Sequence, residues 1–153
     1  MNYWLMKNEP EVFGIEELRQ RPNRTEHWDG VRNYQARNYM RDMEKGDLAL
    51  FYHSNCKPPG VAGLMEITRE AYPDHTAQAP DSPYYDPKAS PENPRWYMVD
   101  VTWRETFEHF VALEELRARK TLSGMKILQK GNRLSITPVT KTEFDMICRM
   151  GRA

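Results

Sequence analysis

The chain has 153 residues with 22 basic and 22 acidic side chains, so its formal net charge is zero. This balance argues against a protein that coats nucleic acid without specificity, since such proteins are usually basic. The length suits a single domain over residues 1–153. No apolar run approaches the about 20 residues that cross a bilayer, so we expect no membrane partner.

Apolar periodicity and turn residues predict the elements of the first half of the chain. In chain order these are a strand at 2–7, a short helix at 15–19, a helix at 34–43 capped by Asn33, a buried strand at 48–53 and a strand at 61–67. The turn Pro58-Pro59-Gly60 separates the last two, so we expect these two strands to pair with each other.

The segment from Pro73 to Pro94 contains six prolines and almost no aliphatic residues. We expect no regular structure there, and a loop of this length inside a compact domain is usually functional. The elements predicted after it are a strand at 96–103, a helix at 113–119, a strand at 133–139 and a helix at 141–147 opened by a capping box at Thr140. Strands interspersed with short helices indicate an α+β fold, a small mixed barrel wrapped by helices.

The charges are unevenly distributed along the chain. Between Leu18 and Arg41 there are six arginines against two acidic residues, and between Arg117 and Arg133 there are six basic residues and no acidic one. A basic face on a neutral protein favours a specific polyanion partner of modest affinity, while the alternative is a solvated surface.

Cysteine and histidine usage gives no sign of a metal site. Cys56 and Cys148 lie far apart, and the four histidines share no metal-ligand spacing. We therefore expect free thiols in a reducing compartment, no metal and no cofactor. The residues after Met1 resemble neither a signal peptide nor a basic tail, which predicts a cytoplasmic protein and favours a bacterial source.

The most informative segment runs from His27 to Met40. It combines arginine, asparagine and glutamine side chains with a tryptophan and two tyrosines. A core helix needs apolar residues every three or four positions, whereas polar and aromatic residues alternate here. Aromatic faces beside amides and guanidinium groups suit a flat, hydrogen-bonding ligand such as a nucleobase. The alternative is a surface helix whose tyrosines pack on the core.

Catalytic patterns are weak in this sequence. His53 and Ser54 are adjacent, and adjacent residues on a strand point to opposite faces, so they do not form a catalytic pair. The segment around Gly60 and Gly63 lacks the context of a phosphate-binding loop. Binding is better supported: Lys7, Asn8 and Glu9 follow the first strand, where polar residues often line the mouth of a barrel.

Two aromatic groups are candidates for ligand contacts. Trp28 precedes Asp29-Gly30, so its ring is presented from a turn, although a tryptophan is also often a buried part of the core. Tyr84 and Tyr85 lie between prolines and form a rigid aromatic projection; alternatively, they pin the loop to the core.

Several segments together resemble the EVE domain family. The matching segments are 3–10, Trp28 to Asn38, 46–48, Phe51 to Asn55, 59–63, 82–87 and 94–101. They occur in the expected order along nearly the whole chain. One residue departs from the pattern, because the family usually has Ser where this chain has Asn8; both side chains form hydrogen bonds, but their geometry differs.

The resemblance implies a PUA-like mixed β-barrel of about five to six strands with short peripheral helices, in the superfamily of the YTH domains that read N6-methyladenosine. By that similarity, Trp28 is the wall of an aromatic cage, and Lys7 and Asn8 lie near the base edge. His53, Ser54 and Asn55, at the end of the strand predicted at 48–53, are neighbouring pocket residues. Side chains of the next helix close the pocket or meet the flanking backbone: Asn33, Tyr34, Arg37 and Asn38.

The function implied by the resemblance is non-catalytic binding of a modified nucleobase, a cytosine derivative or methylated adenine, in DNA or RNA. A small molecule in the same pocket is a further expected ligand. Two other functions stay open. One is a hydrolase of modified nucleosides that uses Lys7 with Glu9. The other is a small-molecule sensor or protein-interaction module that makes its contact through Tyr84 and Tyr85.

Overall fold

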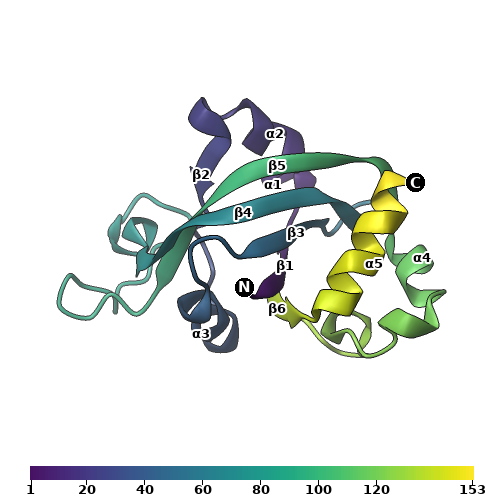
Figure 1. The fold of residues 1–153 in the computed structure, drawn as a ribbon. Helices are drawn as coiled ribbons and strands as arrows, with labels where there is room; N and C mark the ends of the chain where they lie inside the picture. The colour runs from purple at the N-terminus through teal and green to yellow at the C-terminus, as the bar shows by residue number, and fades with distance from the viewer.

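The computed structural model describes residues 1–153 as one six-stranded mixed sheet with short helices packed around it (Figure 1). The strand order is β2-β5-β4-β3-β1-β6. The strands are β1 (Tyr3–Asn8), β2 (Thr25–His27), β3 (Leu48–His53), β4 (Gly60–Pro73), β5 (Tyr97–Ala112) and β6 (Ile136–Val139). The α+β class and the six strands confirm the fold expected from the sequence.

The sheet is barrel-like but not closed. β1 pairs in parallel with β3 and antiparallel with β6, whereas β3, β4, β5 and β2 pair antiparallel in turn. Register shifts interrupt the long β4–β5 pairing at several points, and such irregularities bend strands. The edge strands β2 and β6 do not pair with each other, so one side of the barrel stays open.

Five α-helices surround the sheet. They are α1 (Pro10–Phe13), α2 (Ile15–Gln20), α3 (Tyr34–Asp42), α4 (Leu113–Arg117) and α5 (Lys141–Arg152). In Figure 1, α1 and α2 lie near β2, whereas α4 and α5 lie together at the other end of the long strands. None of the helices combines the length and the hydrophobicity needed to span a bilayer.

Both faces of the sheet are buried, each by its own apolar cluster. Alternate residues of β3 point to opposite faces: Ala49 and Phe51 belong to one cluster, and Leu50 and Tyr52 belong to the other. This double burial explains why Leu48–His53 reads as a continuous apolar run, and β3 has the bounds that the sequence predicted.

The bounds of other elements differ from the prediction, because strand pairing extends beyond the residues whose local pattern indicates a strand. β5 continues to Ala112 and β4 to Pro73, because each long strand supplies the other's hydrogen-bonding partners. The short β2 was missed, since its polar residues show no strand pattern and it is held by β5. The capping box at Thr140 is confirmed, although α5 ends at Arg152 rather than at Ile147.

The proline-rich segment between β4 and β5 is irregular, as expected, with one short 3-10 helix at His75–Gln78. It is nevertheless well anchored. The Trp96 indole N–H donates to Asp86 at 2.7 Å, and the backbone N–H of Asp86 donates to the carbonyl of Ala77 at 2.8 Å. These bonds hold distant parts of the loop together and give it a fixed shape.

Candidate functional site

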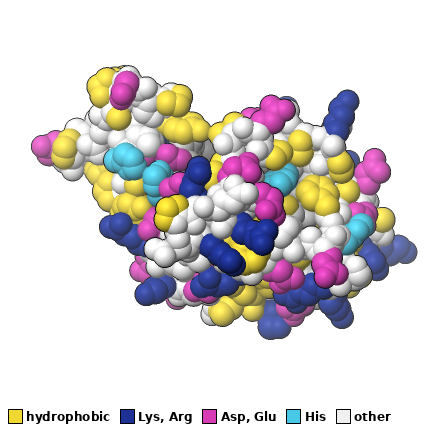
Figure 2. Space-filling model, turned by 90° about the horizontal axis from the view of Figure 1, so that it is seen from above, with side chains coloured by type: hydrophobic (Ala, Val, Ile, Leu, Met, Phe, Trp, Pro, Cys, Tyr) yellow, Lys and Arg dark blue, Asp and Glu magenta, His cyan; other side chains and the backbone are white.

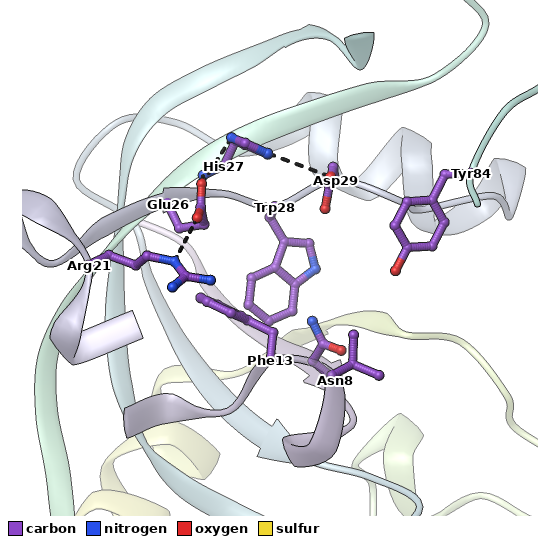
Figure 3. Close-up of a pocket in the computed structure, with 9 residues that line it drawn as sticks. Asn8, Phe13, Arg21, Glu26, His27, Trp28, Asp29 and Tyr84 are labelled. Atoms are coloured by element: carbon purple, nitrogen blue, oxygen red, sulfur yellow. Dashed lines mark hydrogen bonds and ion pairs between the residues drawn. The ribbon is translucent and has the colours of Figure 1, made fainter. Parts of the chain in front are cut away.

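A pocket of about 260 Å³ lies where the end of β1, α1, β2 and the proline-rich loop meet (Figure 3). We call it the Trp28 pocket. It is lined by Asn8, Val12, Phe13, Arg21, Glu26, His27, Trp28, Asp29 and Tyr84. Binding pockets for drug-sized ligands span roughly 300–1,000 Å³, so this volume suits one small flat group.

Trp28 is both part of the core and a wall of the pocket. Its backbone N–H donates to the Val99 carbonyl at 2.7 Å, which holds the residue beside β5 directly after β2. Its ring makes edge contacts with Phe51 at 5.3 Å and Phe13 at 6.4 Å between centroids. The residue is only 4 % exposed. The pocket therefore meets the N–H edge of Trp28 rather than an open ring face.

The indole N–H of Trp28 is a free donor at this pocket. The protein provides it with no hydrogen-bond acceptor, and the atom is not sealed from solvent. By contrast, the indole N–H groups of the other three tryptophans donate to protein oxygens: Trp4 to Asp47, Trp96 to Asp86 and Trp103 to Thr106. A donor left unpaired at a pocket wall is available to a ligand acceptor.

Asn8 supplies a second donor. Its Oδ1 accepts from the backbone N–H of Glu9 at 2.8 Å, which fixes the orientation of the amide where β1 ends. Its Nδ2 has no partner in the protein and points toward the Trp28 indole in Figure 3. An amide whose oxygen is occupied presents its N–H₂ to the pocket.

Asp29 supplies the acceptor. Its Oδ2 lies 3.5 Å from Nε2 of His27, whose Nδ1 lies 2.9 Å from Glu26 Oε1. Arg21 in turn donates to Glu26 at 2.8 Å. Burial raises the pKa of the Asp29 carboxyl, and the neighbouring His27 opposes this rise. In Figure 3, the Asp29 carboxylate, the Trp28 indole nitrogen and the Asn8 amide nitrogen follow one another down the pocket.

Tyr84 closes the opposite side, with its phenol oxygen directed toward the pocket (Figure 3). Its ring packs on Gly30, which has a φ of 80° and no room for a side chain, because a Cβ there would lie 2.8 Å from the Tyr84 ring. Arg32 donates from Nε and Nη2 to the Tyr84 carbonyl at 3.0 and 2.7 Å. The loop wall is thus fixed from the turn that follows Trp28.

Asp74 links that turn to the loop. Its side chain is fully buried and accepts from the Gly30 backbone N–H at 2.9 Å and from Arg32 Nη1 at 3.0 Å. Thr76 donates to the same carboxylate from both its N–H and its hydroxyl. Burial alone raises the pKa of Asp74, but these hydrogen bonds and the Arg32 charge lower it below the usual range.

A second, polar hollow adjoins the Trp28 pocket and shares Asn8 with it. Its lining residues are Lys7, Asn8, Glu9, Ser54, Asn132, Arg133 and Ser135. A third hollow shares Lys7 and Asn132 with the second and is also lined by Tyr52, Leu113, Arg117, Ile127, Leu128, Gln129, Lys130 and Gly131. We call these two hollows together the basic groove. Burial lowers the pKa of Lys7 within it.

The residues predicted near the mouth of the barrel divide between these two places. Asn8, Trp28 and Tyr84 come together in the Trp28 pocket, and Lys7, Glu9 and Ser54 line the basic groove. Two further residues make contacts within the protein instead. His53 accepts from the Ile15 backbone N–H at 3.2 Å, and Asn55 donates to Glu9 Oε1 at 2.9 Å.

The residues predicted around α3 lie outside the Trp28 pocket. Asn33 caps α3 by accepting from the Ala36 N–H at 2.9 Å. Tyr34 stacks on Trp96 with ring centroids 4.9 Å apart. Arg37 donates to the Arg95 carbonyl and to Asn38. Tyr85, predicted from the proline-rich loop, is exposed and does not line the pocket either.

Six of the nine lining residues were not predicted from the sequence: Val12, Phe13, Arg21, Glu26, His27 and Asp29. A signal for Asp29 existed, because it directly follows Trp28 in a turn and so emerges at the same place. Phe13 gave no such signal, since it reaches the pocket only through the packing of α1 against Trp28.

Comparison with known proteins places this geometry in a family. The EVE domain model matches residues 2–150. Human thymocyte nuclear protein 1 is 48 % identical over 162 residues, which cover 95 % of this chain and 72 % of the human protein. The structure of human THYN1 protein in complex with 5-methylcytosine-containing DNA has a TM-score of 0.94 at 45 % identity, covering 100 % of this chain and 99 % of that one.

Relatives occur in bacteria as well as in eukaryotes. A crystal structure from Pseudomonas syringae has a TM-score of 0.93 at 45 % identity, covering 97 % of this chain and 99 % of that one. The human relative contradicts the bacterial source inferred from the N-terminal residues, because the same domain is found in both groups. Matched by its family model over residues 2–150, the chain belongs to the EVE domain family.

Proposed function

We propose that this protein binds DNA that carries a modified cytosine, and that the Trp28 pocket holds the modified base. The relative in complex with 5-methylcytosine-containing DNA shares 45 % of its residues and nearly all of its fold with this chain. The observation that carries the proposal here is the order of hydrogen-bonding groups along the pocket: one acceptor, Asp29, followed by two donors, Trp28 Nε1 and Asn8 Nδ2.

This order complements the pairing edge of cytosine. Cytosine presents one amino donor, the exocyclic N4–H₂, followed by two acceptors, N3 and O2; a carboxylate accepts well from N4. Thymine has an oxygen in place of the amino group, so it would face the Asp29 carboxylate with a second acceptor. A buried polar group left unpaired costs about 1–3 kcal/mol, which favours cytosine over thymine.

The base must leave the duplex to reach the pocket. Extrusion costs a few kcal/mol, and stacking on an aromatic ring returns about 1–3 kcal/mol per base. Trp28 is only 4 % exposed, so the Tyr84 ring on the opposite wall is the better stacking surface. Affinity for intact duplex is therefore modest, in keeping with a net charge of zero.

Binding to a panel of short oligonucleotides tests the proposal. The panel carries cytosine, 5-methylcytosine, 5-hydroxymethylcytosine, thymine or N6-methyladenine at one position, each in single and double strands. Trp28→Phe keeps an aromatic ring in the core but removes the N–H, and Asp29→Asn keeps the shape but changes the acceptor. We expect the parent protein to prefer a modified cytosine and to discriminate cytosine bases from thymine, and we expect both variants to lose the discrimination between cytosine bases and thymine. Equal binding across the panel would overturn the proposal.

The hydrolase alternative receives less support from the structure. Lys7 and Glu9 line the basic groove rather than the Trp28 pocket, and Glu9 Oε1 already accepts from Asn55. No hydrogen bond or ion pair joins the two proposed catalytic side chains. Incubation with modified nucleosides, followed by mass detection of products, distinguishes an enzyme from a binding module.

A further inference from the structure

We propose that the basic groove binds the phosphodiester backbone of the same strand whose base occupies the Trp28 pocket. This inference rests on the proposed function, since it assigns a path to that strand. The groove carries four basic residues, Lys7, Arg117, Lys130 and Arg133, and a single acidic one, Glu9.

The positive charges of the groove are unneutralised. None of the six basic residues between Arg117 and Arg133, three of which line the groove, has a carboxylate within 4.0 Å, although seven Lys or Arg side chains elsewhere in the protein are paired with one. All six are exposed. Basic residues held close together without counter-charges create a local positive potential that attracts a polyanion.

The other arginine-rich segment, from Leu18 to Arg41, provides the contrast. Three of its arginines pair with acids: Arg19 with Glu16, Arg21 with Glu26, and Arg32 with Asp74. The other three lie over aromatic rings: Arg24 over Trp103, Arg37 over Tyr34, and Arg41 over Tyr97. On the face that carries α2 and β5, basic and acidic side chains are interspersed (Figure 2). Half of the arginines in this segment are thus paired with carboxylates, whereas none of the basic residues between Arg117 and Arg133 is.

The groove meets the Trp28 pocket at Asn8, which lines both the pocket and the second hollow, and Lys7 lines both hollows of the groove. Lys7 and Asn8 are adjacent on β1, so their side chains point to opposite faces of the strand. Lys7 lies over the Tyr52 ring, on the face away from Trp28. A nucleic-acid strand that leaves the pocket past Asn8 therefore has to bend around the end of β1 to place its next phosphates in the groove.

The polar lining also suits phosphate oxygens. The hydroxyls of Ser54 and Ser135 make no hydrogen bond within the protein, and Asn132 uses only its Oδ1, which accepts from the Leu134 N–H at 2.9 Å. Serine, asparagine, lysine and arginine side chains are the usual donors to DNA phosphates. The one acid, Glu9, is partly engaged by Asn55. The second hollow is thus lined almost entirely by hydrogen-bond donors.

Phosphate contacts position the nucleic acid but carry no sequence information. Each neutralised phosphate releases counterions, so the logarithm of the binding constant falls with the logarithm of salt by about 0.7 per contact for a single strand and 0.9 for a duplex. Groove variants should therefore weaken binding to modified and unmodified DNA by the same factor.

The test compares Arg117→Gln and Lys130→Gln with Arg149→Gln, which removes the same charge from an exposed position on α5 outside the groove. Binding is measured for oligonucleotides with 5-methylcytosine or cytosine between about 50 and 200 mM salt. We expect each groove variant to weaken both complexes about three- to tenfold at low salt and to reduce the salt slope by nearly one. The free nucleoside 5-methylcytidine, which has no phosphate, should bind all variants alike.

Strand polarity sharpens the test. The groove adjoins the pocket on one side only, so phosphates on one side of the bound base enter it. Two oligonucleotides, one with 5-methylcytosine at its 5′ end and one with it at its 3′ end, should therefore differ: one keeps the full salt slope and the other loses it. Equal slopes at both ends, or groove variants that bind like Arg149→Gln, would overturn this inference. If the parent protein shows no preference for modified cytosine, the proposed function fails instead, whatever the groove variants do.

Discussion

The Trp28 pocket and the basic groove adjoin each other but are lined by different kinds of side chains. The pocket is formed by a core tryptophan, a half-buried carboxylate and a loop fixed by Asp74. The groove is formed by unpaired basic residues, of which Lys7 is half-buried and the others are exposed, and by free hydroxyls. In the proposed function, the preorganised pocket discriminates between bases, whereas the open charged groove adds affinity without discrimination. A net charge of zero conceals this division, because the positive charge is concentrated where the strand would lie.

The largest effect is expected from a variant that disrupts the Trp28 pocket and leaves the basic groove intact. Asp74→Ala leaves Arg32 and the Gly30 N–H without their acceptor, and breaking a buried pair costs about 3–5 kcal/mol. We expect this loss in the free energy of unfolding, measured with denaturant. The variant should lose preference for modified cytosine while keeping the salt slope of its residual DNA binding. Unchanged preference would mean that the loop wall has no part in recognition.

The same carboxyl predicts a dependence of stability on pH. Because the pKa of Asp74 is lower in the folded protein than in the unfolded chain, its contribution is present above the usual Asp value of about 4 and is lost as pH falls through the folded pKa. Asp74→Asn should remove this component. A variant whose stability falls with acid as steeply as that of the parent would contradict the assignment.

The next effect concerns Asp29. Asp29→Asn should reduce the preference for cytosine over thymine about 5- to 150-fold, since one unpaired polar contact costs about 1–3 kcal/mol. Burial raises the pKa of Asp29. In the parent protein, this preference should therefore begin to weaken, as the pH is lowered, at a pH above the usual Asp pKa of about 4. Asp74 and Glu26 also raise this pKa, whereas His27 lowers it, so His27→Gln should move the weakening of the preference to a higher pH. Preference that is independent of pH would contradict the role of Asp29.

A smaller effect sharpens the description of the groove. Glu9→Gln removes its single acid, so we expect binding to every oligonucleotide to strengthen about two- to threefold, with no change in base preference. Fluorescence anisotropy at low salt measures this gain. Weaker binding in the variant would show that Glu9 contacts the ligand as an acceptor.

The smallest effect lies at the boundary between the two regions. Asn8→Ser shortens the side chain that lines both, and a hydroxyl replaces the amide donor. We expect a loss of about two- to fivefold in affinity for modified cytosine, while the salt slope remains unchanged. A changed slope would place Asn8 on the phosphate path rather than at the base edge.

Local chemistry explains which features the sequence could predict. The apolar run of β3, the Asn33 cap of α3 and the Thr140 capping box depend on neighbouring residues, and all three are confirmed. β2 depends on pairing with β5, a strand far along the chain, so its polar residues gave no local signal.

The site was partly predictable for the same reason. Asn8, Trp28 and Tyr84 come from three distant segments, and the resemblance to a family connected them before the fold did. Tyr34 lies in the same motif as Trp28, yet α3 turns it away to stack on Trp96. Adjacency in a motif therefore does not determine which side chains share a pocket; the direction in which each element leaves the turn does.

The most direct test of the central claim follows the indole N–H of Trp28 by NMR. Four tryptophans give four indole signals, and Trp28→Phe identifies the one of interest. The other three groups already donate to Asp47, Asp86 and Thr106. Addition of a 5-methylcytosine oligonucleotide should shift the Trp28 signal markedly and leave those three nearly unchanged. Binding without any shift of the Trp28 signal would show that the base does not occupy this pocket.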